Sequence, residues 1–493
     1  ILVLPDGTTN TITDGDSYTF EDSTTDEPNA TIFSKDDLTI RGNGTLTVNA
    51  NYNNGITSKD DLKITGGNIT ITSADDGLMG KDSITIKGGN ITINASGDGL
   101  KSTNSEETEK GYIDIQGGTL NITSTNDGIQ AESNVNISDG TINITTGGGS
   151  ANSSSKNNND QNPWGQWGNS SSSSSSTSTD TSSAKAIKAV NTITIDGGTF
   201  TIDSSDDSIH SNNSIVINGG TIDISSGDDG IHSDTTLDIN GGDINISKSY
   251  EGIESTTINI NGGNIHLVAS DDGINASGGN DSSSTSGRPV QNNFSSGNGQ
   301  INFNGGYVYI DASGDGIDAN GSIELNDGTV IVNGPQDNGN GALDYDSTFN
   351  INGGLLIAAG SSGMAQNPST SSTQNSINVY VNGTANSLLT IKAESGEEII
   401  SFAPSKSYQS VIISSPELET GKTYSAYYGG TSTGTSTDGL YTDGTTSGGT
   451  EITSFTLSST VSNVSQSGVT TGGSNSAMPG AGGNMTKPNS GRR

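Results

Sequence analysis

Pairs of consecutive glycines recur along the chain at a nearly constant interval, and this interval constrains the fold more than any other feature. Undisturbed neighbouring pairs are 22, 22, 22 and 21 residues apart. The pairs begin at Gly66, Gly88, Gly117, Gly197, Gly219, Gly241, Gly262, Gly305 and Gly353. Self-similarity at a fixed interval of this length is typical of a solenoid, in which each repeat packs on its two neighbours.

A second repeat, an acid and a glycine followed by Ile or Leu, runs out of phase with the glycine pairs. Its acid is Asp76, Asp98, Asp127, Asp229, Asp272 or Asp315, and degenerate copies contain Asn54, Lys185, Asp207, Glu251 and Gly341 at that position. Between the two repeats apolar and polar residues alternate, as in Ile84-Thr85-Ile86. This alternation is the period of a β-strand with one buried face. The pattern predicts an all-β, right-handed, single-stranded parallel β-helix of about 22 residues per coil, with almost no helix.

The composition agrees with a solenoid. Only 28% of the residues are hydrophobic and 5% are aromatic, values that would indicate disorder in a chain without repeats. A solenoid tolerates them because neighbouring coils share one thin core. An asparagine precedes several glycine pairs, and we expect these residues to stack into an amide ladder. They are Asn218, Asn240, Asn261, Asn304 and Asn352.

The interval divides the chain into four parts. Residues 1–30 are expected to form an N-terminal strand or cap, and residues 31–360 the β-helix. Ser/Asn-rich insertions interrupt it at 147–184 and 277–299, with a shorter polar loop at 360–375. Strand-like runs at 377–381, 388–392, 410–413 and 422–428 predict an antiparallel β module over 376–465 that covers the end of the solenoid. Residues 466–493 are expected to form a disordered tail.

Net charge limits the partners. The formal net charge is −36, which argues against nucleic acid or an anionic membrane as a direct partner. The apolar run at 1–4 is far too short to span a membrane, so membrane insertion is not expected. The chain does not begin with Met, and we expect that a leader was removed or the chain shortened. There is no cysteine, and a continuous hydrogen-bond ladder makes disulfides unnecessary in a secreted solenoid.

The aspartates of the second repeat carry the most informative chemistry. Residues one coil apart stack in a β-helix, so neighbouring carboxylates should lie about 5 Å apart. Two charges at that distance repel by roughly 1 kcal/mol in water and 3 kcal/mol at an effective dielectric constant near 20. Clustered carboxylates with nearby carbonyls suit Ca²⁺, whereas the absence of thiols and the presence of only three histidines disfavour transition metals. We therefore predict calcium sites in three groups: Asp75, Asp76, Asp98 and Asp127; Asp206, Asp207, Asp228 and Asp229; and Asp271, Asp272 and Asp315.

Two details bear on this prediction. Lys185 replaces the acid beside the long insertion, and its charge could substitute for a metal and divide the ladder in two. Alternatively, the aspartates are solvated turn formers, because Asp-Gly is a common turn dipeptide.

A neighbouring column is formed by the residue two positions after each Asp-Gly glycine. It contains Met79, Lys101, Gln130, Lys188, His210, His232, Glu254, Asn275 and Asp318. Lys188, His210 and His232 should align on consecutive coils, either as a groove for an anionic sugar or as a salt-bridged exposed face. Trp164 and Trp167, the only tryptophans, could stack on a sugar or pin their loop to the scaffold. His266 lies in another column and is expected to be incidental.

The Asp-Asp-Gly-Ile and Asn-Gly-Gly repeats, the Ser-rich loops and Lys422-Thr423-Tyr424 resemble a family of secreted bacterial carbohydrate-binding domain proteins. The resemblance covers roughly residues 10–430. It implies a calcium-binding parallel β-helix, similar in fold to pectate lyases, that binds cellulose and pectic acid outside the cell. Pectate lyases pair calcium with a basic residue, a role that Lys101 or Lys188 could imitate, but no motif marks a catalytic residue.

Three functions follow as hypotheses. The first is an extracellular calcium-dependent polysaccharide binder, without catalysis, at the cell surface or in the matrix. The second is a polysaccharide lyase. The third is a structural subunit that self-assembles into fibres through the apolar segment at 1–4.

Overall fold

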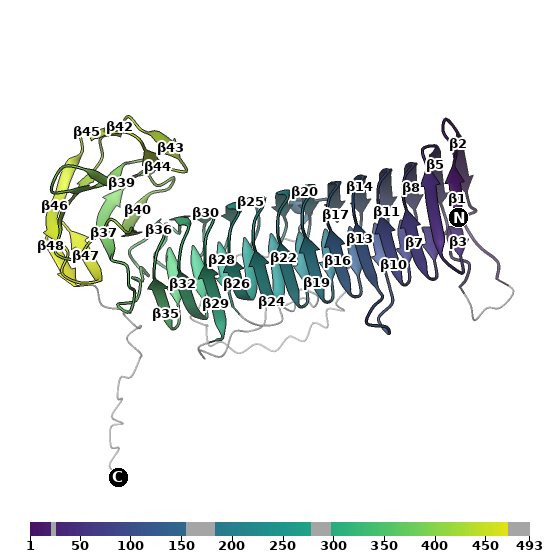
Figure 1. Cartoon of the computed structure of the whole chain (residues 1–493), viewed down its shortest axis with the longest axis horizontal. Coiled ribbons are helices and arrows are strands. Elements are labelled where there is room, and N and C mark those ends of the chain that lie inside the picture. The colour runs from purple at the N-terminus through teal and green to yellow at the C-terminus, as the bar shows by residue number, and fades with distance from the viewer. Residues whose placement is uncertain (21–25, 154–182, 278–296, 472–493) are drawn as a thin grey trace, which may run out of the picture.

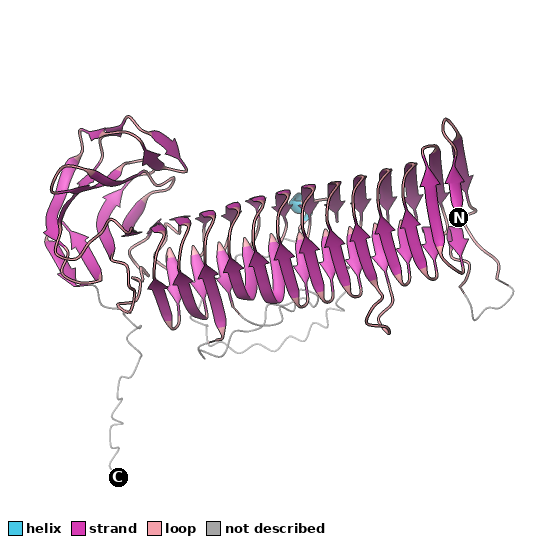
Figure 2. Cartoon of the chain, in the orientation of Figure 1, coloured by secondary structure: helices cyan, strands magenta, loops and turns pink. Residues whose placement is uncertain are grey.

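The predicted all-β parallel β-helix is confirmed. The structure, a computed structural model, describes residues 1–20, 26–153, 183–277 and 297–471. Parallel strands stack along the long axis from the N-terminus, and a C-terminal module of mainly antiparallel strands lies at the other end (Figure 1). Among the described residues the one helical element is a 3₁₀ turn, η1 (Ser150–Asn152) (Figure 2).

A single coil shows how the sequence pattern becomes structure. It contains β9 (Leu78–Gly80), β10 (Ser83–Ile86) and β11 (Asn90–Ala95). The alternating residues of β11 are alternately buried and exposed. Ile84 lies opposite Leu62 of the preceding coil and Ile113 of the following one, both in parallel register. Apolar residues therefore stack on apolar residues along the whole axis.

Two parallel sheets result. The first contains two strands from most coils: β1 (Leu2–Leu4), β3 (Ala30–Ser34), β4 (Leu38–Gly42), β6 (Asn54–Ser58), β7 (Asp61–Ile64), β9, β10, β12 (Leu100–Ser102), β13 (Tyr112–Ile115), β15 (Ile129–Ala131), β16 (Asn134–Ile137), β18 (Ile187–Ala189), β19 (Thr192–Ile195), β21 (Ile209–Ser211), β22 (Ser214–Ile217), β24 (Ile231–Ile239), β26 (Ile253–Ile260), β28 (Ile274–Ala276), β29 (Gly299–Phe303), β31 (Ile317–Ala319), β32 (Gly321–Leu325), β34 (Leu343–Tyr345) and β35 (Thr348–Ile351). The solenoid part of the second sheet contains β2 (Thr9–Thr13), β5 (Thr45–Ala50), β8 (Asn68–Ser73), β11, β14 (Thr119–Ser124), β17 (Thr141–Thr146), β20 (Thr199–Ser204), β23 (Thr221–Ser226), β25 (Asp243–Lys248), β27 (Asn264–Ala269), β30 (Tyr307–Ala312), β33 (Thr329–Asn333) and β36 (Leu355–Gly360).

The turns between the sheets explain both repeats. In the glycine pair, the second residue adopts a left-handed conformation, as at Gly220 with φ of 103°, which only glycine adopts without strain. The asparagines that precede the pairs form the predicted amide ladder. The Nδ2 groups of Asn240, Asn261 and Asn304 each donate to the Oδ1 atom of the asparagine one coil earlier, at 2.8 Å. Asn326 continues the ladder to Asn352.

The solenoid begins earlier than expected. β1 pairs in parallel with β4, and β2 pairs in parallel with β5. The strands within residues 2–13 therefore belong to the stacked sheets, whereas the sequence pattern predicted an N-terminal strand or cap at residues 1–30 and the β-helix from residue 31. The run at 1–4 thus pairs within its own molecule, although Ile1 and Val3 are exposed.

The C-terminal module extends the second sheet. β40 (Tyr408–Ser414) pairs antiparallel with β36 and with β37 (Ser376–Gly383). A second core cluster joins the end of the solenoid to this module. It contains Ile357 of β36 and Val411 of β40. The segment around Ser369 and Ser372 bonds to the backbone of β35. The end of the solenoid is therefore covered, as predicted.

The module contains further strands. They are β38 (Leu389–Ala393), β39 (Glu398–Phe402), β41 (Thr423–Tyr428), β42 (Thr431–Ser432), β43 (Thr435–Thr437), β44 (Leu440–Thr442), β45 (Thr446–Ser447), β46 (Thr450–Thr456), β47 (Val461–Ser465) and β48 (Gly468–Thr471). β47 and β48 pair antiparallel, so the expected disordered tail from 466 is wrong for its first residues, because they complete a hairpin. Within the described part of the chain, no helix is long and apolar enough to cross a membrane.

Candidate functional site

The acids of the second repeat form a hydrogen-bonded ladder along the solenoid. In most of these acids, one carboxylate oxygen accepts the backbone N–H of the residue one coil further on. The pairs, with the residue that donates its backbone N–H named first, are Asp98 and Asp76 (2.9 Å), Asp127 and Asp98 (2.9 Å), Lys185 and Asp127 (2.8 Å), Asp229 and Asp207 (3.1 Å), Glu251 and Asp229 (3.2 Å), and Asp315 and Asp272 (2.6 Å). These carboxylates therefore join adjacent coils.

Burial excludes the alternative of solvated turn formers for most of this ladder. Asp98, Asp127 and Asp207 are between 0% and 3% exposed. The following glycine permits this packing, because a Cβ atom on Gly99 would lie 2.4 Å from the carbonyl oxygen of Gly128. Since one oxygen of each acid is held by a backbone amide, the second oxygen decides what else the ladder binds.

In the N-terminal part of the ladder that second oxygen faces lysines. Lys101 Nζ lies 2.6 Å from Asp98 Oδ2 and 3.8 Å from Asp76 Oδ2. Lys188 Nζ lies 3.2 Å from Asp127 Oδ2. Burial raises the pKa of Asp76 to about 6, although Lys101 opposes the shift. Two lysines thus neutralise part of the charge of the four acids in the first predicted calcium group.

Lys185 supplies the internal cation that its position predicted. Its Nζ atom lies 3.2 Å from Asp206 Oδ1 and also contacts Asp207 Oδ2. Burial works against the charge of Asp207, but Lys185 and the nearby histidines hold the pKa of that carboxyl well below its usual value. Burial likewise opposes the charge of Lys185, and the two aspartates raise its pKa above the usual value. In the second predicted group, Asp206, Asp207 and Asp228 offer oxygens within 4.8 Å of one another.

The C-terminal part of the ladder differs. Asp272, Asp315 and Asp318 place carboxylate oxygens within 4.8 Å of one another. Burial and the neighbouring acids raise the pKa of Asp315 to about 7 and that of Asp318 to about 8. Among the residues that the structure describes, no lysine or arginine pairs with these three acids. This acidic triad therefore concentrates negative charge that bound protons or an external cation would neutralise.

The triad contains one residue that the sequence pattern placed elsewhere. Asp318 belongs to the neighbouring column, and Asp271 of the predicted group is not one of the three. The three-residue spacing from Asp315 to Asp318 was the available signal, because it brings one side chain from each column to the same turn. A further exposed acidic group, Asp36, Asp37 and Asp60, was missed because it lies outside the repeat.

The neighbouring column aligns as predicted. Lys188 lies opposite His210, and His210 lies opposite His232, on consecutive parallel strands. Both alternatives, a groove and a salt-bridged face, placed these side chains on an exposed surface. That expectation is wrong at the histidines, because His210 is 6% exposed and His232 is 1% exposed. Contacts with the acid ladder bury them. Trp164 and Trp167 lie outside the described residues.

The fold and the ladder together define an acidic parallel β-helix with carboxylate clusters that could hold metal ions. Residues 1–230 match the family described as carbohydrate-binding domain-containing proteins, which confirms the resemblance seen in the repeats. A "Carbohydrate-binding domain-containing protein" of Acetivibrio thermocellus is 60% identical over 70 residues, which are 14% of this chain and 24% of that relative.

A solved structure is also similar in sequence. It is titled "Structure of the polysaccharide lyase-like protein from C. thermocellum, Gadolinium derivative" and is 51% identical, with 30% of this chain and 59% of that chain covered and a TM-score of 0.29. The match thus spans about a quarter of the curated relative and less than two thirds of the solved chain.

Proposed function

We propose that this chain is an extracellular, calcium-binding β-helix that binds polysaccharide without cleaving it, at the cell surface or in the matrix. The observation that carries the proposal is the acidic triad Asp272, Asp315 and Asp318, on a solenoid whose N-terminal part matches a carbohydrate-binding family. An all-oxygen donor set suits Ca²⁺, which accepts six to eight oxygen ligands in flexible geometry.

The three carboxylates of the triad fit a calcium site. The three carboxylates converge within 4.8 Å, and burial, together with repulsion from neighbouring acids, raises the pKa values of Asp315 and Asp318 and so opposes their negative charge. A bound divalent cation would offset this repulsion. These three residues would hold the ion, with water and nearby carbonyls completing its shell.

Charge then suggests how the glycan is recognised. A protein with a net charge of −36 repels an anionic polymer such as polygalacturonate, unless cations lie between them. Calcium on the triad would supply that link, whereas a neutral glycan such as cellulose needs no such bridge. Binding of acidic glycans should therefore depend on calcium more strongly than binding of cellulose.

The geometry supports the lyase hypothesis less well than the binding hypothesis. A lyase base must be unprotonated, but Lys101 is held by Asp76 and Asp98. Burial would lower its pKa, and the two aspartates more than reverse this, so the pKa of Lys101 is raised. Fibre assembly stays a prediction, tested by imaging filaments with and without residues 1–4.

The deciding experiment is retention of the purified full chain on covalently immobilised polygalacturonate and on cellulose, with calcium or with a chelator. Covalent attachment keeps the matrix intact when calcium is removed. Asp318→Asn should abolish calcium-dependent retention on polygalacturonate. Asp327→Asn is the matched control, because in the described structure the Asp327 side chain bonds only to a local turn amide, and its variant should bind normally.

Retention on neither matrix would refute the binding proposal. Retention on polygalacturonate that ignores both the chelator and Asp318→Asn would refute the role of the triad. New unsaturated products in the eluate would instead favour the lyase.

A further inference from the structure

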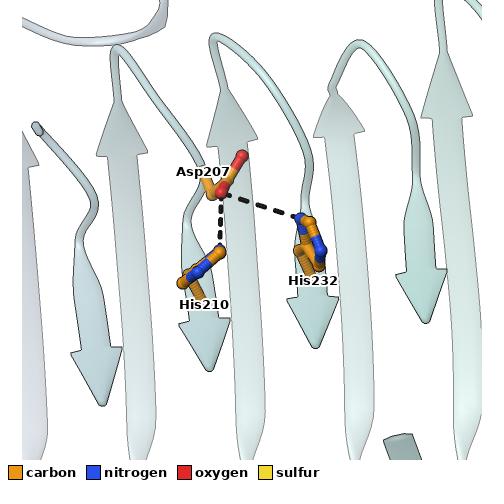
Figure 3. Close-up of side chains that lie close together, drawn as sticks. All are labelled: Asp207, His210 and His232. Atoms are coloured by element: carbon orange, nitrogen blue, oxygen red, sulfur yellow. Dashed lines mark hydrogen bonds and ion pairs between the residues drawn. The ribbon is translucent and has the colours of Figure 1, made fainter. Parts of the chain in front are cut away.

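A second cluster on the solenoid has a different donor chemistry. Asp207 lies in the turn before β21, His210 lies on β21, and His232 lies at the corresponding position of β24. Figure 3 shows the aspartate beside the two imidazole rings, with a dashed contact to each. All three residues are buried, and their potential ligand atoms lie within 4.8 Å of one another.

Both rings direct the same nitrogen toward this aspartate. Nδ1 of His210 lies 2.9 Å from Asp207 Oδ2, and Nδ1 of His232 lies 3.9 Å from the same oxygen. The opposite nitrogens face oxygen acceptors: Nε2 of His210 lies 3.1 Å from Asn212 Oδ1, and Nε2 of His232 lies 3.5 Å from Asp234 Oδ1. Metal-binding histidines commonly donate their other N–H to an outer carbonyl or carboxylate, which fixes the ring and its tautomer.

Both ring nitrogens of His210 have an oxygen partner, Asp207 Oδ2 at Nδ1 and Asn212 Oδ1 at Nε2. With its N–H on Nε2, a neutral ring donates to Asn212 and turns the Nδ1 lone pair toward Asp207, which is the arrangement that lets both atoms bind one metal ion.

Around His232 the spacing matches that between the ligands of one metal ion. Its Nδ1 atom lies 3.5 Å from Asp229 Oδ2, 3.7 Å from Glu254 Oε2 and 3.9 Å from Asp207 Oδ2. Ligand atoms around a tetrahedral zinc ion, with bonds of about 2.0–2.1 Å, are about 3.3 Å apart. Small side-chain movements would bring these atoms to a common ion.

We propose that His210 Nδ1, His232 Nδ1 and Asp207 Oδ2 bind a divalent transition-metal ion of the zinc class, with Asp229 or Glu254 as the fourth ligand. Two imidazole nitrogens distinguish this site from the all-oxygen triad, because imidazole favours zinc, nickel and copper over calcium. The small number of histidines argued against such metals, but two of the three converge here.

Lys185 is compatible with this site. It contacts Asp207 Oδ2 in the described structure, and it also lies 3.2 Å from Asp206 Oδ1. Lys185 can retain the contact with Asp206 while the Asp207 oxygen turns to the metal. The bound ion would link the coils of His210 and His232 and stabilise the solenoid against unfolding.

The test is titration of the full chain with Zn²⁺ by calorimetry, in saturating calcium, so that the acidic triad does not compete. The expected result is one zinc ion per chain with an affinity that His210→Ala and His232→Ala each weaken by more than about 100-fold, while Asn212→Ala weakens it by about 10-fold to 100-fold. His266→Asn is the matched control, because it removes the one histidine outside the site, and it should bind zinc normally.

A second measurement avoids variants that fail to fold. In the wild-type chain, zinc should shift the NMR signals of the imidazole nitrogens of His210 and His232 and leave those of His266 unchanged. Bound Co²⁺ should show the strong visible absorption of a four-coordinate site. Unchanged imidazole signals, or zinc binding that survives both histidine substitutions, would overturn the proposal.

Discussion

His266 and Asp438 are 172 positions apart in the sequence, yet Nε2 of His266 lies 2.8 Å from Oδ2 of Asp438. The same oxygen accepts a hydrogen bond from the Tyr307 hydroxyl at 2.7 Å. Asp438 lies between β43 and β44 of the C-terminal module, whereas the other two residues lie on β27 and β30 of the solenoid. The expectation that His266 is incidental is therefore wrong, because this residue joins the module to the flank of the solenoid.

Replacing this aspartate should loosen the module. Asp438→Asn keeps a side chain that tolerates the left-handed backbone, with φ of 51°, and removes the charge. Hydrogen bonds to charged groups contribute about 1.5–3 kcal/mol, so we expect a loss of that size in the free energy of unfolding of the module. Faster hydrogen exchange across residues 435–442 would report the change locally.

Asp443→Asn is the control for this experiment. Asp443 is also left-handed, with φ of 56°, but it is exposed. The control should exchange at the wild-type rate. Equal exchange in Asp438→Asn and the wild type would show that the contact does not hold the module in place.

Loss of the internal cation should be more costly. Lys185→Met removes the charge that faces Asp206 and Asp207 and leaves the fully buried Asp207 short of a partner. Removing one partner of a buried ion pair costs about 3–5 kcal/mol, measurable as a lower urea midpoint. Lys59→Met, which removes a partly exposed pair with Glu27, should cost less than about 1 kcal/mol. Similar midpoints for the two variants would contradict the role of Lys185.

The acidic triad predicts how stability depends on pH. The pKa of Asp315 is raised to about 7 and that of Asp318 to about 8, from an ordinary value of 3.8. The folded state therefore binds protons more tightly than the unfolded state, and the contribution of these groups is fully present below about pH 4 and lost as the pH rises to 8. In a chelator, the melting temperature should fall across this range relative to a sample with calcium.

Asp318→Asn tests whether the triad causes this slope. Without calcium at pH 8, the variant should be more stable than the wild type, because one of the crowded charges is gone. With calcium the order should reverse, because the variant has lost a ligand. Asp327→Asn should follow the wild type in both conditions, and a variant that is less stable in both would argue against charge crowding.

The solenoid could be predicted from the sequence because its information is local and repeated. Each coil repeats the same turn and the same inward-pointing isoleucines. The register of His210 with His232 therefore follows from counting residues between repeats. The function of each ladder oxygen could not be predicted in this way. Counting places Asp98 and Asp272 in equivalent positions, but only the structure shows Lys101 beside the first and Asp318 beside the second.

Burial of the histidine side chains was the other property that could not be predicted from the sequence. The histidine column points away from the core, and a side chain that points outward in one coil is covered only when its neighbours and the acid ladder close over it. The contact between His266 and Asp438 was inaccessible for a related reason, since no repeat links the module to a particular coil. Such long-range contacts depend on how the module docks and not on local pattern.

The glycine that follows most of the ladder acids gives a final prediction. A Cβ atom at Gly99 would lie 2.4 Å from both the Gly128 carbonyl oxygen and Ile122 Cγ2, so Gly99→Ala must push two coils apart. We expect it to lower the free energy of unfolding by about 3 kcal/mol, the upper end for overpacking. Gly396→Ala separates this steric effect from backbone strain, because Gly396 has φ of 89° and a Cβ atom there would meet nothing within 4 Å; it should cost about 1–2 kcal/mol. If Gly99→Ala proves no less stable than Gly396→Ala in urea, the coils are free to separate locally, and close approach is not the reason for glycine in the ladder.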